Sequence, residues 1–243
     1  MGTVKGRIHA LETGGMVDGP GIRFVAFLQG CPLRCLYCHN PDSWAVGKGR
    51  EMTAQELVDE AWKYRTYMKA SGGGITLSGG EPLFQPEFVL DVIRIAHEKG
   101  MTVAIDTSGY GNPERVRNCL DEADLIILDI KTALAEKHRD LTGITAERPR
   151  AILEYLKQSR KPLWVRHVVV PGLTDSRENL EALKEILTDI PSLEKFEFLP
   201  FHKMGEEKWE QEGLLYKLGG TLAPDQGFMD RISEDFRRAG IPM

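Results

Sequence analysis

A strand-like segment followed by a helix-like segment recurs six times along this chain of 243 residues. Most of the strand-like segments are continuous apolar runs, which is typical of parallel strands that are covered on both faces. Six such units are fewer than the eight of a closed barrel. We therefore expect an α/β fold, specifically a partial, open (β/α)6 barrel of parallel strands with outer helices. The predicted strands lie at residues 21–30, 73–80, 102–109, 124–131, 162–172 and 194–200.

The segments between these strands carry apolar residues at helical spacing. In the first of them, Thr53 and Glu56 have the spacing of a capping box, and Gly100 is placed to end the second. No linker-like or low-complexity stretch interrupts the pattern, so we expect a single domain over residues 1–243. The predicted helices lie at 52–70, 85–100, 113–121, 148–159, 175–190 and 225–239.

The composition narrows the possible partners. The net charge is −5 and the sequence pI is about 5.8, with no basic tail or stripe, which argues against nucleic acid as the main partner. No stretch approaches the ~18 continuous apolar residues of a membrane span, and the first residues lack the apolar core of a signal peptide. These features predict a cytoplasmic protein that does not bind a membrane.

Three of the four cysteines, Cys31, Cys35 and Cys38, lie in one loop, residues 30–40, with the spacing C-x3-C-x2-C. Closely spaced soft thiolates suit either zinc or an iron–sulfur cluster. A structural zinc site takes four ligands, and His39 is a poor fourth ligand because it adjoins Cys38. The trio therefore favours a [4Fe–4S] cluster in which the three cysteines bind three of the irons. The fourth iron stays open to a small molecule. Zinc or unbound thiols remain the alternative.

The fourth cysteine lies outside this loop. Cys119 shares one face of a predicted helix with Val116 and Leu120, so it is expected to be an ordinary core cysteine. Other polar residues follow the ends of several predicted strands, in the stretches "SGGEP", "DTSG", "DIK" and "PFHKMG". Because the carboxyl ends of parallel strands share one edge, that edge is the predicted site.

The cysteine motif, with Tyr37 as its aromatic residue, together with "SGGEP" resembles the radical S-adenosylmethionine (SAM) enzymes. The resemblance implies that the open iron binds SAM and that the reduced cluster cleaves it to a 5′-deoxyadenosyl radical. No catalytic residue beyond the cluster and the cosubstrate is then needed. The resemblance assigns SAM contacts to Tyr37, Cys38, His39, Gly80, Asp129, Ile130, Lys131 and His202. It assigns a Na⁺ or K⁺ site to Asp106, Thr107 and Asp129.

For some of these residues, a purely structural role stays open as the alternative to ligand binding. Asp129 and Lys131 point to the same side of a strand and could be a solvated pair at its end, and a lone histidine such as His202 is more often structural. Arg166, in an apolar strand, could pair with a ligand or belong to a buried ion pair.

A narrower resemblance covers nearly the whole chain, from about Gly6 to Gly240. The stretches "DGPGIRF", "SGGGITLSGGEPL", "VRHVVVPGLTD" and "LPFHKMGEEKW" resemble the activating enzymes of glycyl radical enzymes. No further cysteines occur between Cys38 and Glu51, which favours the type that acts on pyruvate formate-lyase. The resemblance implies abstraction of a hydrogen atom from a glycine of pyruvate formate-lyase or a related glycyl radical enzyme. It also implies flavodoxin or ferredoxin as the electron donor.

The stretch Asp18, Gly19, Pro20 and Gly21 is a tight turn in the simplest interpretation. The resemblance implies in addition that this loop meets the glycine loop of the partner enzyme. Two other functions stay open: activation of another glycyl radical enzyme, such as a diol dehydratase, and electron transfer by a cluster that never cleaves SAM.

Overall fold

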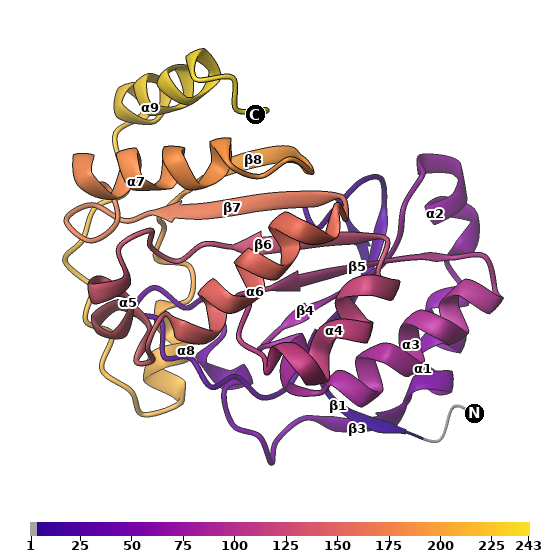
Figure 1. The fold of residues 1–243 in the computed structure, drawn as a ribbon. Helices are drawn as coiled ribbons and strands as arrows, with labels where there is room; N and C mark the ends of the chain where they lie inside the picture. Colours follow the sequence, from indigo (N-terminus) through magenta and orange to yellow (C-terminus); the bar gives the residue numbers. More distant parts are fainter. Residues whose placement is uncertain (1–3) are drawn as a thin grey trace. The chain divides into compact units, whose positions relative to one another are not determined.

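The computed structural model describes residues 4–243 as an α/β protein (Figure 1). The chain divides into two compact units. The first contains the residues up to Pro32 together with Ser43–Ile127, and the second contains Leu33–Asp42 and Leu128–Met243. Strand β6 (Leu125–Asp129) runs from the first unit into the second. A single domain over residues 1–243 stays a prediction.

The first unit is a mostly parallel sheet with the strand order β3-β1-β2-β4-β5-β6. Strands β2 and β4 are parallel, as are β4 and β5, and they are buried along nearly their whole length, as continuous apolar runs predict. Besides β6, the strands of this unit are β1 (Lys5–Gly15), β2 (Arg23–Leu28), β3 (Arg50–Thr53), β4 (Gly74–Gly79) and β5 (Thr102–Thr107). Its helices are α1 (Ala54–Trp62), α2 (Arg65–Ser71), α3 (Pro86–Glu98) and α4 (Pro113–Glu122), with a short 3-10 turn, η2 (Pro82–Phe84).

The second unit carries the parallel pair β7 (Leu163–Val169) and β8 (Leu193–Pro200). Helix α9 packs on β8, where the rings of Phe196 and Phe236 stack with their centroids 5.4 Å apart. The helices of this unit are α5 (Ala135–Thr142), α6 (Glu147–Ser159), α7 (Arg177–Thr188), α8 (Glu206–Gln211) and α9 (Gln226–Arg238), and the 3-10 turn η1 (Pro41–Ser43) follows the cysteine loop.

The predicted fold class is confirmed: all six predicted strands are present, their connections run through helices, and the sheet is open. Two antiparallel strands, β1 and β3, were not predicted, and neither were α5 and α8. The single helix predicted at 52–70 is wrong in detail. The structure breaks it at Tyr64, whose ring packs against Phe24 of β2 with the centroids 5.8 Å apart. The capping box of Thr53 and Glu56 forms as predicted.

Within residues 4–243, no helix combines the length and the apolar character that a bilayer crossing needs.

Candidate functional site

The turn after β4 lies directly against the start of the cysteine loop in the first unit. Gly80 N donates to Leu28 O at 2.8 Å, and Glu81 N donates to Gly30 O at 2.9 Å. A Cβ at Gly80 would stand 2.4 Å from Gly30 O, so a side chain there would push the two segments apart. The glycine therefore permits the close approach of "SGGEP" to the residue that precedes Cys31.

Glu81 is fully buried and holds this turn to the end of β5. Its carboxylate accepts hydrogen bonds from Leu83 N at 3.0 Å, Thr107 Oγ1 at 2.6 Å and both the N–H and the hydroxyl of Ser108. Burial raises the pKa of Glu81, and these hydrogen bonds oppose the shift. The carboxylate therefore joins the turn after β4 to the end of β5, a structural role that sequence reasoning did not identify.

Two of the three predicted cation ligands, Asp106 and Thr107, are the last residues of β5 in the same unit. Asp106 accepts a hydrogen bond from Ser78 Oγ at 2.7 Å. The hydroxyl of Thr107 donates to Glu81 and accepts from Gly109 N at 2.9 Å. The third predicted ligand, Asp129, belongs to the second unit. The cation site stays a prediction.

The loop Asp18–Gly21 lies at the opposite, amino-terminal end of β2. The carbonyl of Asp18 accepts a hydrogen bond from Thr76 Oγ1 at 2.7 Å, and Gly21, at φ 68°, leaves no room for a Cβ beside Gly73 N. Next to it, burial lowers the pKa of Arg23 to about 10, while the charges of Asp124 and Asp18 oppose that shift. Within the first unit, this loop and the Gly30–Gly80 contact therefore belong to different ends of the strands.

In the second unit, the rest of the cysteine loop is fixed by backbone and indole contacts. Arg34 N donates to Thr142 O at 2.7 Å and Leu36 N to Leu141 O at 3.0 Å, at the end of α5. The indole N–H of Trp209 in α8 donates to Cys38 O at 2.8 Å. The two helices that the sequence did not reveal thus hold this loop in place.

Tyr37 points into an apolar cluster with Leu141, Val170, Phe201 and Leu218. Its hydroxyl is buried without a hydrogen-bond partner among the described residues, and burial raises its pKa. Lys131 Nζ lies 5.7 Å from the centre of the Tyr37 ring. A buried hydroxyl that lacks a partner costs free energy, which a polar ligand beside the ring would recover.

Asp129 and Lys131 lie side by side at the end of β6, with Lys131 Nζ 2.6 Å from Asp129 Oδ2. Burial alone would lower the pKa of Lys131, but the charges of Asp129, Tyr37 and Cys35 outweigh it and raise the pKa well above its ordinary value. Burial also raises the pKa of Cys35 to about 12, against the effect of Lys131. Without a metal the Cys35 thiol is therefore neutral, and a bound iron would deprotonate it.

His39 and His202 form a stacked pair with their ring centroids 4.1 Å apart. His39 Nε2 lies 3.1 Å from His202 O, and Gly205 approaches the His39 backbone so closely that a Cβ would stand 2.6 Å from its Cα. The second unit therefore brings together Cys35, Tyr37, Asp129 and Lys131 as one group, with Ile130 buried behind it, and His39 with His202 as another.

The four cysteines are free thiols. Cys31 belongs to the first unit, and Cys35 and Cys38 to the second. Among residues 4–243, no three His, Cys, Asp or Glu side chains form a group that could hold a single metal ion. Cys119 is buried, and its Sγ lies 3.2 Å from Pro86 O, as expected of a core cysteine.

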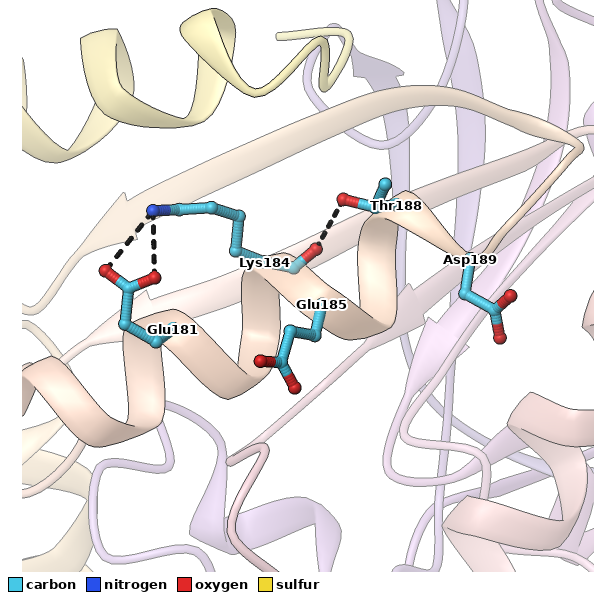
Figure 2. A pocket seen from close by; sticks show the side chains of 5 residues that line it. All are labelled: Glu181, Lys184, Glu185, Thr188 and Asp189. Carbon is cyan, nitrogen blue, oxygen red and sulfur yellow. Dashed lines mark hydrogen bonds and ion pairs between the residues drawn. The ribbon is translucent and has the colours of Figure 1, made fainter.

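A surface pocket of about 390 Å³ lies elsewhere in the second unit, along α7 (Figure 2). Its lining combines three carboxylates and Thr188 with one lysine, Lys184, which pairs with Glu181 at 3.2 Å and with Asp235. None of the predicted site residues lines this pocket. The lining residues are Glu181, Lys184, Glu185, Thr188 and Asp189.

Residues 25–183 match the family model described as the Radical SAM superfamily. The chain belongs to this superfamily. It is 45% identical over 225 residues to the pyruvate formate-lyase-activating enzyme of Clostridium pasteurianum, covering 92% of this chain and 93% of the relative. It is 42% identical over 232 residues to the pyruvate formate-lyase 1-activating enzyme of Escherichia coli K12, covering 95% of this chain and 94% of the relative.

A solved domain of a pyruvate-formate lyase-activating enzyme from Bacteroides vulgatus shares the fold. Its TM-score is 0.59 at 22% identity, over 70% of this chain and 97% of that domain. The residues described above fit the cofactors of a radical SAM protein. Soft thiols suit iron, and the Tyr37 hydroxyl and the Asp129–Lys131 pair can contact a polar cosubstrate.

Proposed function

We propose that this protein is a pyruvate formate-lyase activating enzyme, a radical SAM oxidoreductase. The observation that carries this proposal is the match of 42–45% identity over more than nine-tenths of the chain to proteins of that name. The spacing of the three cysteines and the turn at Gly80 support it. The reaction is the abstraction of a hydrogen atom from one glycine of the partner enzyme.

Cys31, Cys35 and Cys38 hold a [4Fe–4S] cluster in this proposal. When bound, the cluster would supply the single electron that reductive cleavage of SAM requires. The chain's own residues bind and orient the cosubstrate: Lys131 offers three N–H donors to a carboxylate, and Asp129 accepts hydrogen bonds from ribose hydroxyls. In the described structure these two side chains neutralise each other at 2.6 Å, which lowers the cost of keeping both charges partly buried until a ligand arrives.

Tyr37, His39 and His202 complete the nucleoside side of the proposed site, while Cys38, Gly80 and Ile130 contribute backbone. Asp106, Thr107 and Asp129 are the proposed ligands of a Na⁺ or K⁺ ion. Flavodoxin or ferredoxin is the proposed electron donor, and the cytoplasm the proposed location. The loop Asp18–Gly21 is proposed to meet the protein substrate.

The decisive experiment mixes the anaerobically reconstituted protein with pyruvate formate-lyase, SAM and a one-electron reductant. Electron paramagnetic resonance should show a glycyl radical on the partner, together with release of 5′-deoxyadenosine and methionine. Release of 5′-deoxyadenosine without a radical on this partner, but with one on another glycyl radical enzyme, would reassign the substrate. Absence of SAM cleavage would leave only electron transfer.

A further inference from the structure

Two buried polar side chains of the second unit occupy positions that suit apolar residues. His167 in β7 has no exposed surface, and Asn179 in the first turn of α7 is 1% exposed on the helix face that it shares with Leu183 and Leu187. Burying a polar group without a hydrogen-bond partner costs free energy, so buried polar side chains are normally hydrogen-bonded. The partners of His167 and Asn179 therefore show which segments these two side chains hold.

Both side chains hold the segment that leaves β6. The carbonyl of Ile130 lies 2.6 Å from His167 Nδ1. On the far side of Lys131, Asn179 Oδ1 accepts hydrogen bonds from Thr132 Oγ1 at 2.8 Å and Ala133 N at 2.9 Å. The backbone is therefore fixed one residue before Lys131 and two residues after it, although this segment has no regular secondary structure.

The contacts determine the state of the imidazole. Ile130 O can only accept, so His167 Nδ1 carries the hydrogen, and in the neutral ring Nε2 is then the acceptor, with Thr174 O 3.5 Å from it. Asn179 Nδ2 lies 3.3 Å from that Nε2 and donates its other hydrogen to Thr174 O at 2.7 Å. Burial lowers the pKa of His167, which keeps the ring neutral and the network intact.

The same network reaches the loop that follows β7. Thr174 Oγ1 donates to Val168 O at 2.6 Å and accepts from Val170 N at 2.8 Å. Val170 packs in the apolar cluster that contains Tyr37. The segment after β6, which carries proposed cosubstrate contacts, and the loop after β7, which packs against Tyr37 through Val170, are thus tied to one set of buried side chains.

We propose that His167 and Asn179 are positioning residues for SAM: by fixing the backbone on both sides of Lys131, they hold Lys131 and Asp129 where the cosubstrate binds. The role rests on the proposed function. A lysine side chain has many rotamers, and binding of SAM must order it. A backbone that is already fixed around Lys131 reduces the conformational entropy that is lost when SAM binds. The sequence offers one signal for this role, which is a polar residue at a buried position of an apolar strand and of an amphipathic helix.

The test compares network variants in the anaerobically reconstituted protein. His167→Phe and Asn179→Leu should weaken SAM binding by about ten-fold, since the first removes the hydrogen bond to Ile130 O and the second removes those to Thr132 and Ala133. Their iron content should stay normal. His167→Asn keeps an N–H near the position of Nδ1 and should recover most of the affinity. Without SAM, hydrogen exchange should accelerate at residues 130–134 in the first two variants.

Leu187→Ala is the matched control, because it opens a cavity on the same helix away from Ile130. It should lower the urea midpoint at least as much as the network variants but leave the affinity for SAM unchanged. If affinity followed the urea midpoint in all variants, the network would be structural only. Should His167→Phe fail to fold, Thr132→Val removes the hydrogen bond to Asn179 and the one that Leu134 N donates to Thr132 Oγ1, and an affinity equal to that of the parent would overturn the proposal.

A double-mutant cycle separates this role from the site itself. Because the network acts in part through Lys131, adding His167→Phe to Lys131→Ala should cause a smaller loss of affinity than His167→Phe causes in the parent. Fully additive losses would overturn the positioning role. If Lys131→Ala alone left affinity unchanged, the proposed SAM site would fail and the positioning role with it. If Lys131→Ala weakened binding but the network variants did not, only the positioning role would fail.

Discussion

Lys131 and Lys195 form ion pairs of the same local kind, each with a carboxylate two residues away at 2.6 Å. Their surroundings differ, since the side chain of Lys131 is 14% exposed beside Cys35 and Tyr37, whereas that of Lys195 is 37% exposed above Trp164. Lys131 is therefore the lysine that we propose to meet a ligand, whereas Lys195 covers the surface.

Lys131→Ala should weaken SAM binding by about ten- to a hundred-fold, because one charge-assisted hydrogen bond contributes roughly 1.5–3 kcal/mol. Lys195→Ala, the matched control, should leave the affinity unchanged. The measurement is the dissociation constant of SAM on protein with an assembled cluster. An unchanged constant for Lys131→Ala would make the pair with Asp129 a structural one.

The cysteines allow a second prediction at this scale. Reconstituted protein should carry about four irons per chain, and Cys31→Ser, Cys35→Ser or Cys38→Ser should each remove most of the iron. Cys119→Ser should keep it, because Cys119 is buried against Pro86 O in the first unit. Iron and sulfide analysis decides this, and loss of iron from Cys119→Ser would overturn the ligand assignment.

At the scale of elements, one buried carboxylate joins the turn after β4 to the end of β5. Four hydrogen bonds converge on Glu81 from Leu83, Thr107 and Ser108. The carboxylate is suited to this position because, when it is ionised, both of its oxygens accept hydrogen bonds and neither donates one. The turn that approaches Gly30 therefore depends on Glu81 for its shape.

Glu81→Gln should lower the free energy of unfolding by about 1–3 kcal/mol, since the amide group would turn N–H donors toward other donors. Glu87→Gln is the control: Glu87 pairs with Arg115 at 2.6 Å with its side chain 62% exposed, so its loss should change the free energy by less than about 0.5 kcal/mol. Urea unfolding measures both. Equal stability of Glu81→Gln and the parent would show that the turn does not need the charge.

At the scale of the whole molecule, the proposed substrate is a protein, so a contact with the partner should be separable from a contact with SAM. The loop Asp18–Gly21 precedes β2, whereas Gly30 and Gly80 follow the carboxyl ends of β2 and β4. The carbonyl of Asp18 is already bound by Thr76 Oγ1, so the backbone of this loop is held without a partner.

Asp18→Ala should keep the iron content, the affinity for SAM and the slow cleavage of SAM that occurs without a partner. It should lower the yield of glycyl radical or raise the partner concentration that is needed, because an ionised carboxylate can accept hydrogen bonds from an inserted loop. The two readouts are 5′-deoxyadenosine release and the spin count. Equal loss of both, with normal partner affinity, would place the loop in the cosubstrate site.

The strands and most helices could be predicted because their signals are local. Continuous apolar runs and helical spacing of apolar residues are dictated by backbone periodicity, and they identified β2, β4 to β8 and the helices that separate them, apart from α5. The spacing of the three cysteines is equally local. It predicts a metal-binding loop and, through the resemblance, indicates the superfamily that the comparisons show.

Contacts between residues far apart in the chain decided the rest. Strand β1 has mostly polar residues and β3 has four residues with one buried side chain, so only their pairing with each other and with β2 makes them strands. The structural role of Glu81 depends on Ser108, 27 residues away, and that of His167 on Ile130, 37 residues away. A buried polar residue acquires its role from the partners that the fold brings to it, and no local pattern in the sequence specifies those partners.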